Sequence, residues 1–404
     1  MMRCKICDSK TQTIISLGKM PVSNAFTKNP NKKEYTFTLS VVFCPKCYMV
    51  QLGEVPKPEV MFNPNYAFFS MTSRIMGEHF KDVADEIINR LKGSKDTFVV
   101  ELGSNDGIML QHIKKAHIKH LGVEPAENVA KIAKKQGISV LQKFFDDKVA
   151  REIEIKHGRA DVIFSANSLL SIEELNRTFE GFALLLKDNG VLMFEDPYMY
   201  DIVTLTSFDQ IYDEHIFFFS GHSVKELGAF HGLQLVDMKH QNVHGGSMRY
   251  YLKKGSNNKI GTHVKKYIDL EKKAKLNTIK GYLQFRDKVN KICTDLKKTL
   301  LKLKKHGYAI GGYGATSKST TLFNYASIGP ELIDYITDTT PTKIGTFTPG
   351  VHIPVKDREH FLQNKPPYTL LLAWNHQKEI FEKEKDYRKN GGKFITYFPN
   401  IKIW

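Results

Sequence analysis

The stretch TFVVELGSNDGIMLQHIKKA, residues 97–116, decides the fold of this chain. A short β-branched apolar run, which predicts a buried strand, leads into a turn from Gly103 to Gly107, and a helical pattern begins at once. A glycine turn lets the backbone approach a ligand closely, and the helix N-terminus that follows it favours negative charge. The spacing Gly-x-x-x-Gly differs from the Gly-x-Gly-x-x-Gly of dinucleotide-binding domains. We therefore expect a nucleotide-type α/β domain without the dinucleotide fingerprint.

Strands and helices continue to alternate on the C-terminal side of this stretch. Helical patterns at 107–116 and 127–136 separate short apolar runs, and a further helix is expected before them, from about Thr72 to Leu91. The apolar runs are TFVVEL (97–102), HLGVEP (120–125), ISVLQ (138–142), ADVIFSA (160–166) and GVLMFEDP (190–197). Strand-rich sequence returns at 233–240 and 247–254. This alternation predicts a doubly wound parallel sheet.

Two glutamates near strand ends indicate the ligand of this sheet. Glu124 lies about 20 residues past the glycine turn, where a carboxylate can accept both ribose hydroxyls and would repel a 2′-phosphate. The form Glu-x-Gly-x-x-x-Gly followed by Glu-Pro-Ala resembles a class I S-adenosylmethionine (SAM) methyltransferase, whose ligand carries no phosphate. A doubly wound domain that binds some other nucleotide is the alternative.

The resemblance to SAM methyltransferases implies a set of cofactor-binding residues. Asn105 and Asp106 would hold the methionine part, Phe144 or Phe145 would cover the adenine, and Asn167 would lie at the sulfonium. The full expected set is Glu101, Gly103, Asn105, Asp106, Gly107, Glu124, Pro125, Phe144 and Asn167.

Four of the five cysteines form two Cys-x-x-Cys pairs near the N-terminus. The pairs are Cys4 with Cys7 and Cys44 with Cys47. Each pair has the spacing of a zinc knuckle, and two knuckles close a tetrahedral Cys4 site with no open position for water. We therefore expect a structural zinc ion in a small N-terminal lobe, in which 35–43 form a strand.

The C-terminal third predicts a helical connector and a second α/β unit. The connector is one long helical stretch from about Thr262 to Lys304, with few breakers. Strand-like runs then follow at 308–314, 332–338, 369–374 and 393–398. The run from Gly311 to Lys318 places three glycines between a strand and a helix, with a lysine one turn into the helix, which suits an anion. No glycine precedes Lys318, so the P-loop pattern is not met, and a tight turn that binds nothing is the alternative.

The densest group of reactive side chains lies at 212–215. Tyr212, Asp213, Glu214 and His215 follow the fifth strand of the first sheet, at the carboxyl edge where such sheets bind ligands. Side chains at i and i+3 share a face, so Tyr212 and His215 are expected to reach one substrate. With Glu214 orienting His215, the set suits proton removal next to a carbonyl, with His215 as base. A satisfied capping cluster is the structural alternative.

At these residues the whole chain resembles the sugar-nucleotide C-methyltransferase family. The family pattern Tyr-x-Glu-His is matched by Tyr212, Glu214 and His215, and its His-Gly-Gly-Ser turn by 244–247. The C-terminal glycine loop of the family is matched by 311–318, and the turns at 338–341, 348–350 and 352–354 also resemble the family pattern. The sequence departs from the pattern at Asp213, where histidine is usual, and at 167–171.

The resemblance implies the fold, the reaction and the substrate site. The fold is a zinc-binding lobe (1–62), a SAM methyltransferase domain (63–255), a helical connector (256–305) and a smaller Rossmann-like domain (306–404). The reaction is methylation of a nucleotide-diphosphate keto-sugar through an enolate, for deoxysugar or surface-polysaccharide synthesis, with Tyr212, Glu214 and His215 catalytic. The substrate-binding residues would be His244, Ser247, Gly312, Gly314, Ala315, Ser317, Lys318 and Asp338. The loop at 311–318 would cradle the diphosphate.

Composition leaves other function classes open. The chain has 404 residues, 41% hydrophobic and 25% charged, with a formal charge of +16, much of it between Lys253 and Lys305. This balance favours anionic partners, so an RNA methyltransferase with a zinc ribbon is an alternative, as are O- or N-methylation and a non-catalytic sugar-nucleotide binder. We expect the lysines to form a solvated helix face instead. No signal peptide or membrane span is evident, and paired thiols without a secretion signal fit a cytoplasmic metal site better than disulfides.

Overall fold

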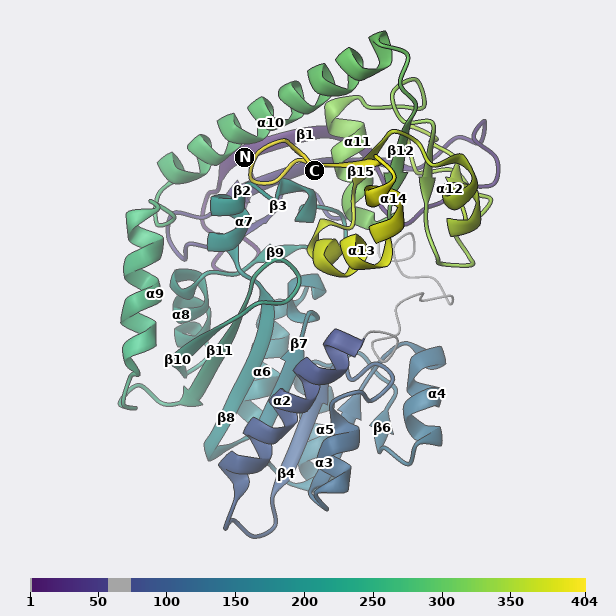
Figure 1. The fold of residues 1–404 in the computed structure, drawn as a ribbon. Helices are drawn as coiled ribbons and strands as arrows, with labels where there is room; N and C mark the ends of the chain where they lie inside the picture. The colour runs from purple at the N-terminus through teal and green to yellow at the C-terminus, as the bar shows by residue number, and fades with distance from the viewer. Residues whose placement is uncertain (1, 57–73) are drawn as a thin grey trace.

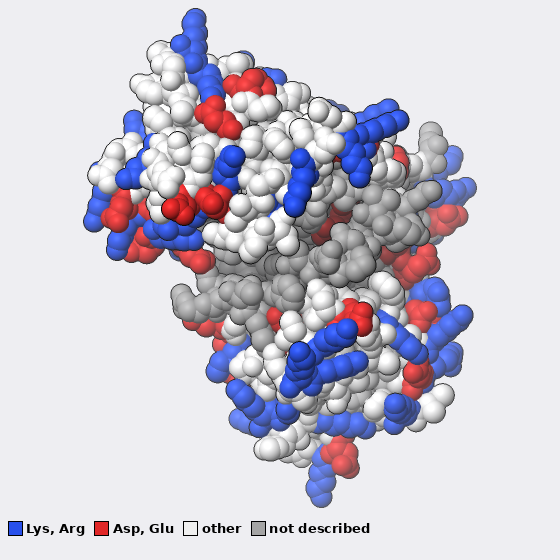
Figure 2. All heavy atoms as spheres, turned by 90° about the vertical axis from the view of Figure 1, so that its right-hand side faces the viewer, with Lys and Arg blue, Asp and Glu red and all other residues white. Residues whose placement is uncertain are grey.

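The computed structural model describes residues 2–56 and 74–404 and arranges them around three β-sheets (Figure 1). One sheet has four strands, one has seven and one has six. In the described part of the chain, no helix is both long and apolar enough to cross a bilayer. On the face shown in Figure 2, lysine and arginine side chains are interspersed with aspartate and glutamate.

The N-terminal lobe is built on an antiparallel sheet in the order β1-β2-β3-β9. Its own strands are β1 (Gln12–Pro21), β2 (Thr36–Phe43) and β3 (Val50–Leu52). The strand predicted before Cys44 is confirmed as β2, which pairs with β1 and β3. The fourth strand, β9 (Phe217–Phe218), comes from far along the chain, directly after the Tyr212–His215 group. The lobe therefore holds the segment predicted to be catalytic.

The central domain is the predicted doubly wound sheet, in the order β10-β11-β8-β7-β4-β5-β6. Strands β4 to β8 are parallel, while β11 and β10 add antiparallel strands at one edge. The strands are β4 (Phe98–Leu102), β5 (Lys119–Val123), β6 (Val140–Leu141), β7 (Ala160–Ala166), β8 (Leu186–Pro197), β10 (Leu233–Gln241) and β11 (Ser247–Lys254). The all-apolar pattern of β4 follows from burial on both faces of a parallel sheet.

Helices cover both faces of this sheet (Figure 1). They are α2 (Arg74–Leu91), α3 (Leu110–Lys115), α4 (Glu127–Lys135), α5 (Asp147–His157), α6 (Leu175–Leu185), α7 (Met199–Leu205) and α8 (Gly221–Phe230). The expectation that a helix begins immediately after the glycine turn was wrong, since turns fill 103–109 and α3 begins at Leu110. Of the helix expected from Thr72, the first residues lie outside the described part of the chain.

The predicted single helical connector is two helices. Helix α9 (Thr262–Lys273) packs on α8 and β10, and α10 (Ile279–Lys305) crosses the outside of the molecule (Figure 1). The turn between them is closed by the Tyr282 hydroxyl, which donates to the Leu276 carbonyl at 2.9 Å. The apolar side of α10 is buried, and its exposed lysines are Lys280, Lys288, Lys291, Lys298, Lys302 and Lys305.

The C-terminal sheet has the order β14-β13-β12-β15-β16-β17, with only the last strand antiparallel. Its strands are β12 (Ile310–Tyr313), β13 (Tyr335–Thr337), β14 (Val355–Lys356), β15 (Tyr368–Leu371), β16 (Lys393–Thr396) and β17 (Lys402–Ile403). Its helices are α11 (Ser317–Ala326), α12 (Arg358–Asn364), α13 (Gln377–Lys383) and α14 (Lys385–Lys389). Helix α11 follows β12 through the glycine loop, as the sequence predicted.

The cores do not follow the domain boundaries drawn on the sequence. One buried cluster joins side chains of β1 and β2, such as Ile15 and Val41, to α10 and to residues of the C-terminal sheet such as Ile336. A second cluster joins the cysteine end of the lobe, including Cys44 and Met49, to the central domain. The lobe is therefore packed against both α/β units.

Candidate active site

The glycine turn after β4 is held open by Glu124. Gly103 and Gly107 have φ of +66° and +86°, and Asn105 between them has +49°, so the turn uses left-handed backbone that favours glycine. One oxygen of Glu124, at the end of β5, accepts from the Asn105 amide at 2.9 Å, and the other accepts from the Ala126 amide at 2.9 Å. Each carboxylate oxygen keeps further acceptor capacity for a ligand hydroxyl.

Three carboxylates converge beside this turn. Glu101 is 2% exposed, and its Oε2 is buried without a hydrogen-bond partner among the described residues. Burial raises the pKa of Glu101 well above its usual value, and the nearby charges of Glu124 and Asp106 raise it further. Burial also raises the pKa of Glu124. Such a group suits a ligand that brings hydroxyl donors and positive charge.

Residues predicted at the adenine and the sulfonium border the same sheet edge. Phe145 is buried and stacks on Phe182 with ring centroids 5.4 Å apart, whereas Phe144 is 73% exposed. Asn167 follows β7 with φ of +52°, and its amide donates to the Glu195 carbonyl at 2.8 Å. Pro125 lies next to Glu124, at the end of β5.

A buried ion network supports this edge and was not anticipated from the sequence. Glu195, in β8, accepts from Arg249 of β11 at 2.5 Å, and its other oxygen lies 2.6 Å from Nε2 of His79 in α2. Arg249 also donates to Glu86 of α2 at 2.6 Å. The hydrogen-bonded pairs of this network lie 54 to 163 positions apart in sequence, so no local pattern links them.

Tyr212 and His215 share a face, as their spacing predicted. Their ring centroids are 4.0 Å apart. Nδ1 of His215 lies 2.8 Å from the Gln210 carbonyl, which can only accept, so Nδ1 carries the proton and Nε2 keeps a lone pair. Burial lowers the pKa of His215 to about 3, and the positive charge of Lys318 contributes. The imidazole is therefore neutral at pH 7.

Glu214 does not orient His215, and that expectation was wrong. Its carboxylate instead accepts from the Asn24 amide nitrogen at 2.6 Å, across the join with the N-terminal lobe. Burial and the neighbouring Asp213 raise the pKa of Glu214 to about 7. Asp213 is 1% exposed and accepts from the Ser23 amide at 2.9 Å. The orienting role falls to the Gln210 backbone, which a side-chain motif could not reveal.

The turn from His244 to Ser247 lies between the two α/β units. A Cβ on Gly245 would lie 2.4 Å from the Trp374 ring, and one on Gly246 would lie 2.2 Å from Asp201. Ser247 closes the turn by donating to the Val243 carbonyl at 3.3 Å. Nε2 of His244 is buried without a partner among the described residues, and burial, with Lys318 next, lowers its pKa to about 4. This imidazole is thus also neutral.

The C-terminal glycine loop places Lys318 beside these histidines. Nζ of Lys318 lies 4.7 Å from the centroid of Trp374, whose indole nitrogen donates to Asp209 at 2.8 Å. Asp209 immediately precedes Gln210, the residue that orients His215. The Tyr212–His215 group, the 244–247 turn and Lys318 are spread over more than 100 positions of sequence and meet at one place.

Side chains from outside the glycine loop, those of Asp338 and Lys343, bind its backbone. Asp338 accepts from the Ala315 amide at 2.6 Å and from the Thr340 amide at 2.7 Å. Lys343, which the sequence analysis missed, donates to the Ala315 carbonyl at 2.7 Å and lies 4.7 Å from the Phe26 ring. The remaining predicted residues lie along the loop: Gly312 in β12, Gly314 with φ of +93°, and Ser317 as the first residue of α11.

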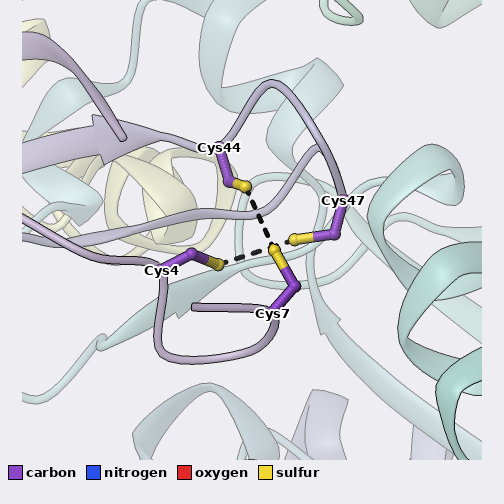
Figure 3. Close-up of side chains that lie close together, drawn as sticks. All are labelled: Cys4, Cys7, Cys44 and Cys47. Atoms are coloured by element: carbon purple, nitrogen blue, oxygen red, sulfur yellow. Dashed lines mark hydrogen bonds between the residues drawn. The ribbon is translucent and has the colours of Figure 1, made fainter. Parts of the chain in front are cut away.

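The four cysteines form a compact cluster away from this site (Figure 3). The Sγ atoms of Cys4 and Cys47 lie 3.5 Å apart, as do those of Cys7 and Cys44, and all four lie within 4.8 Å of one another. Four sulfurs about 2.3 Å from a tetrahedral zinc would be about 3.8 Å apart, so the cluster fits the ion. It also offers four thiol donors and no other ligand, which suits a closed, structural site.

Comparison with known families and proteins agrees with this arrangement. Residues 4–62 match the family described as "Putative zinc binding domain", residues 76–238 a methyltransferase domain, and residues 242–399 the C-methyltransferase C-terminal domain. C-methyltransferase NovU of Streptomyces niveus is 28% identical over 404 residues, covering 99% of this chain and 96% of its own.

Two solved structures each match less than half of the chain. A SAM-dependent methyltransferase from Clostridium acetobutylicum is 13% identical with a TM-score of 0.35, over 44% of this chain and 92% of its own. Magnesium protoporphyrin IX methyltransferase from Synechocystis, with SAM bound, is 12% identical with a TM-score of 0.34, over 45% of this chain and 82% of its own. The three family matches and the full-length similarity to NovU show a SAM-dependent C-methyltransferase, in which the zinc-binding match, the methyltransferase domain and the C-methyltransferase C-terminal domain follow one another.

Proposed function

We propose that this C-methyltransferase acts on a nucleotide-diphosphate keto-sugar and methylates the carbon next to the ketone, in deoxysugar or surface-polysaccharide synthesis. One observation carries the proposal: the Tyr212/His215 pair, His244 and Lys318 converge from separate elements where the two α/β units meet. The group combines an available lone pair with hydrogen-bond donors and one buried cation. Such a set suits proton removal and stabilisation of the resulting oxyanion.

His215 is the base in this proposal. A ketone acidifies the neighbouring C–H bond, and Nε2 of His215 is the unprotonated nitrogen able to take that proton. The low pKa of the free imidazole reflects burial and the charge of Lys318. A bound diphosphate would bring negative charge that raises His215 basicity toward what the reaction needs. Tyr212, in ring contact with His215, would orient the sugar.

The C-terminal unit would hold the nucleotide diphosphate. Thr316 caps α11 through the Ser319 amide, which leaves the amides of Ser317 and Lys318, at the start of this ten-residue helix, facing a ligand. Lys343 provides a second buried cation near the same loop. Asp338 is then a residue that shapes the loop through the Ala315 amide.

The substrate class can be tested by melting the protein with S-adenosylhomocysteine present and adding TDP, UDP, GDP, CDP or a short RNA in turn. A rise in Tm with one nucleoside diphosphate supports the proposal, because a ligand of the folded state stabilises it by mass action. A rise with RNA alone would replace the proposal with nucleic-acid methylation.

The reaction can be tested with keto-deoxysugars linked to the nucleotide that the melting assay selects. Transfer of a ¹³C methyl group from SAM should give a product whose new methyl carbon is bonded to carbon in its NMR spectrum. A methyl bonded to oxygen or nitrogen would contradict C-methylation of the sugar. His215→Ala should lose turnover and keep SAM binding, whereas His306→Ala, at the exposed end of α10, should change neither.

A further inference from the structure

Lys318 is a buried cation without a charged partner in contact. Its ammonium forms no hydrogen bond and no ion pair with any residue in the described ranges, and its Nζ lies 4.7 Å from the centroid of the Trp374 ring. Burial lowers the pKa of Lys318, and Asp209 is the nearby charge that opposes the fall. A lysine in this condition has a donor free for a ligand and a more acidic N–H than usual.

The surroundings of Lys318 fix the direction of that donor. Trp374 lies against Gly245, next to His244, and binds Asp209, next to the residue that orients His215. Lys318 is close enough to both histidines to lower their pKa values. Its side chain therefore lies on the side of α11 that faces the reacting groups.

Another lysine near the glycine loop, Lys343, is placed to support the negative charge of a diphosphate. It lies at the Ala315 carbonyl and is near Asp338 and Glu214. The loop thus has two lysines with different surroundings: Lys343 near Asp338, Glu214 and loop backbone, and Lys318 near neutral imidazoles, an indole and the carboxylate of Asp209. Only Lys318 shares its surroundings with the candidate base.

We propose that Lys318 is a catalytic residue, which donates a hydrogen bond from its ammonium to the carbonyl oxygen of the keto-sugar, and that Asp209 is a positioning residue that keeps this lysine charged. The proposal rests on the keto-sugar substrate proposed above, and it moves Lys318 from the diphosphate to the reacting end of the sugar. Asp209 is fully buried, with one oxygen held by Trp374 and Tyr397 and the other unpartnered among the described residues.

The step balances as a proton abstraction followed by methyl transfer. Nε2 of His215 takes the proton on the carbon next to the ketone, and the C–H electron pair becomes the C=C bond of an enolate whose oxygen accepts from Lys318. The enolate carbon then forms a bond to the methyl carbon of SAM as the carbon–sulfur bond breaks. The carbonyl reforms and S-adenosylhomocysteine leaves, so Lys318 returns with its proton.

The test measures proton abstraction separately from binding. Wild type, Lys318→Ala, Lys318→Met and Lys318→Arg are incubated in D₂O with S-adenosylhomocysteine and keto-deoxysugars linked to TDP, CDP, GDP or UDP, and deuterium uptake next to the ketone is followed by NMR. Removing one donor to an oxyanion slows reactions about 10²- to 10³-fold, so Lys318→Met should slow exchange by that factor. Its Kd for the nucleoside diphosphate should change less than about threefold.

Two further variants separate catalysis from structure. Lys318→Ala should regain exchange when ethylamine is added, because a soluble ammonium can occupy the space left by the side chain, which a structural lesion would not permit. Lys318→Met leaves Asp209 buried without its cation, so the double variant with Asp209→Asn restores neutrality. It should melt higher than the single variant yet remain as slow in exchange.

Each outcome decides the matter. Normal exchange in Lys318→Met, or normal exchange with diphosphate binding weakened more than tenfold, overturns the proposal and leaves the keto-sugar reaction standing. Loss of exchange with intact binding and amine rescue supports it. If wild type exchanges and methylates none of the keto-sugars, the proposed function fails, and the role of Lys318 at a carbonyl fails with it.

Discussion

Arg249 is the residue whose loss should most disturb the SAM-binding edge of the sheet. Its side chain is 2% exposed and reaches Glu195 at 2.5 Å and Glu86 at 2.6 Å. Substituting Arg249→Met keeps most of the side-chain volume and leaves two carboxylates without their shared cation. Breaking a buried ion pair from one side costs about 3–5 kcal/mol, because the remaining charge stays buried.

The lowered pKa of Glu86 reflects the interaction with Arg249 together with those of its other partners. Burial would raise it, but the charge of Arg249 and hydrogen bonds from Tyr251 and Arg90 lower it to about 2. A fall from an ordinary value near 4.3 to about 2 corresponds to about 3 kcal/mol of stability. Since the pKa is lowered in the folded state, this stabilisation is complete above about pH 5 and is lost as pH falls toward 2.

Hydrogen exchange measured by mass spectrometry can follow the strands involved. Protection of amides in β11 and β8 should fall about 10²- to 10⁴-fold in Arg249→Met, since each 1.4 kcal/mol is tenfold. Arg90→Met is the matched control, because Arg90 binds the same Glu86 at 3.0 Å but is 40% exposed, and it should lose less than about 1 kcal/mol. Equal losses in the two variants, or a loss below about 1 kcal/mol in Arg249→Met, would refute the reasoning.

Three further outcomes are expected. A strong zinc chelator should lower the Tm, and Cys44→Ser should lower it without chelator, because the cluster stabilises the lobe; an unchanged melting curve would contradict a structural zinc. Gly103→Ala should weaken S-adenosylhomocysteine binding at least tenfold by calorimetry, because a Cβ at this position would lie 2.0 Å from the Ser168 hydroxyl at a φ of +66°. Gly232→Ala is the control: its φ is +70°, the space around it is open, and this variant should bind S-adenosylhomocysteine normally. Glu214→Gln should be more stable than wild type at pH 8 and not at pH 4. The pKa of Glu214 in the folded state is raised to about 7, so wild type loses stability as pH rises through 4.5 to 7. A gain in stability that is equal at both pH values would count against this assignment.

The sequence predicted the parts of the fold that depend on local periodicity. The β4 run, the glycine turn and the β5 run could be located because buried parallel strands are apolar and turns need glycine. The cysteine pairs predicted a metal cluster because thiol ligands come in short fixed spacings. The break between α9 and α10 was missed, since lysines and leucines there are compatible with a continuous helix.

Long-range partners in the site could not be predicted in the same way. Nothing in the sequence near Glu214 indicates that Asn24 would be its hydrogen-bond donor, 190 positions away. His79 and Arg249 are ordinary surface-type residues until the fold brings them to Glu195. Spacing can show that Tyr212 and His215 share a face, but which backbone carbonyl holds an imidazole depends on the path of the folded chain.

The shared core of the lobe and the C-terminal sheet has a consequence for how the protein is made. Strands β1 and β2 leave the ribosome before α10 and the residues beyond 310, yet their apolar side chains pack on these later segments. Thr320 reaches back to the Ser23 carbonyl, and Gly350 to Glu34, across about 300 positions of chain. The two strands must therefore wait, partly uncovered, until these later segments have been synthesised. A nascent chain stalled before residue 310 should bind holdase chaperones through this end, and an early zinc ion would keep its cysteine turns in register during the delay.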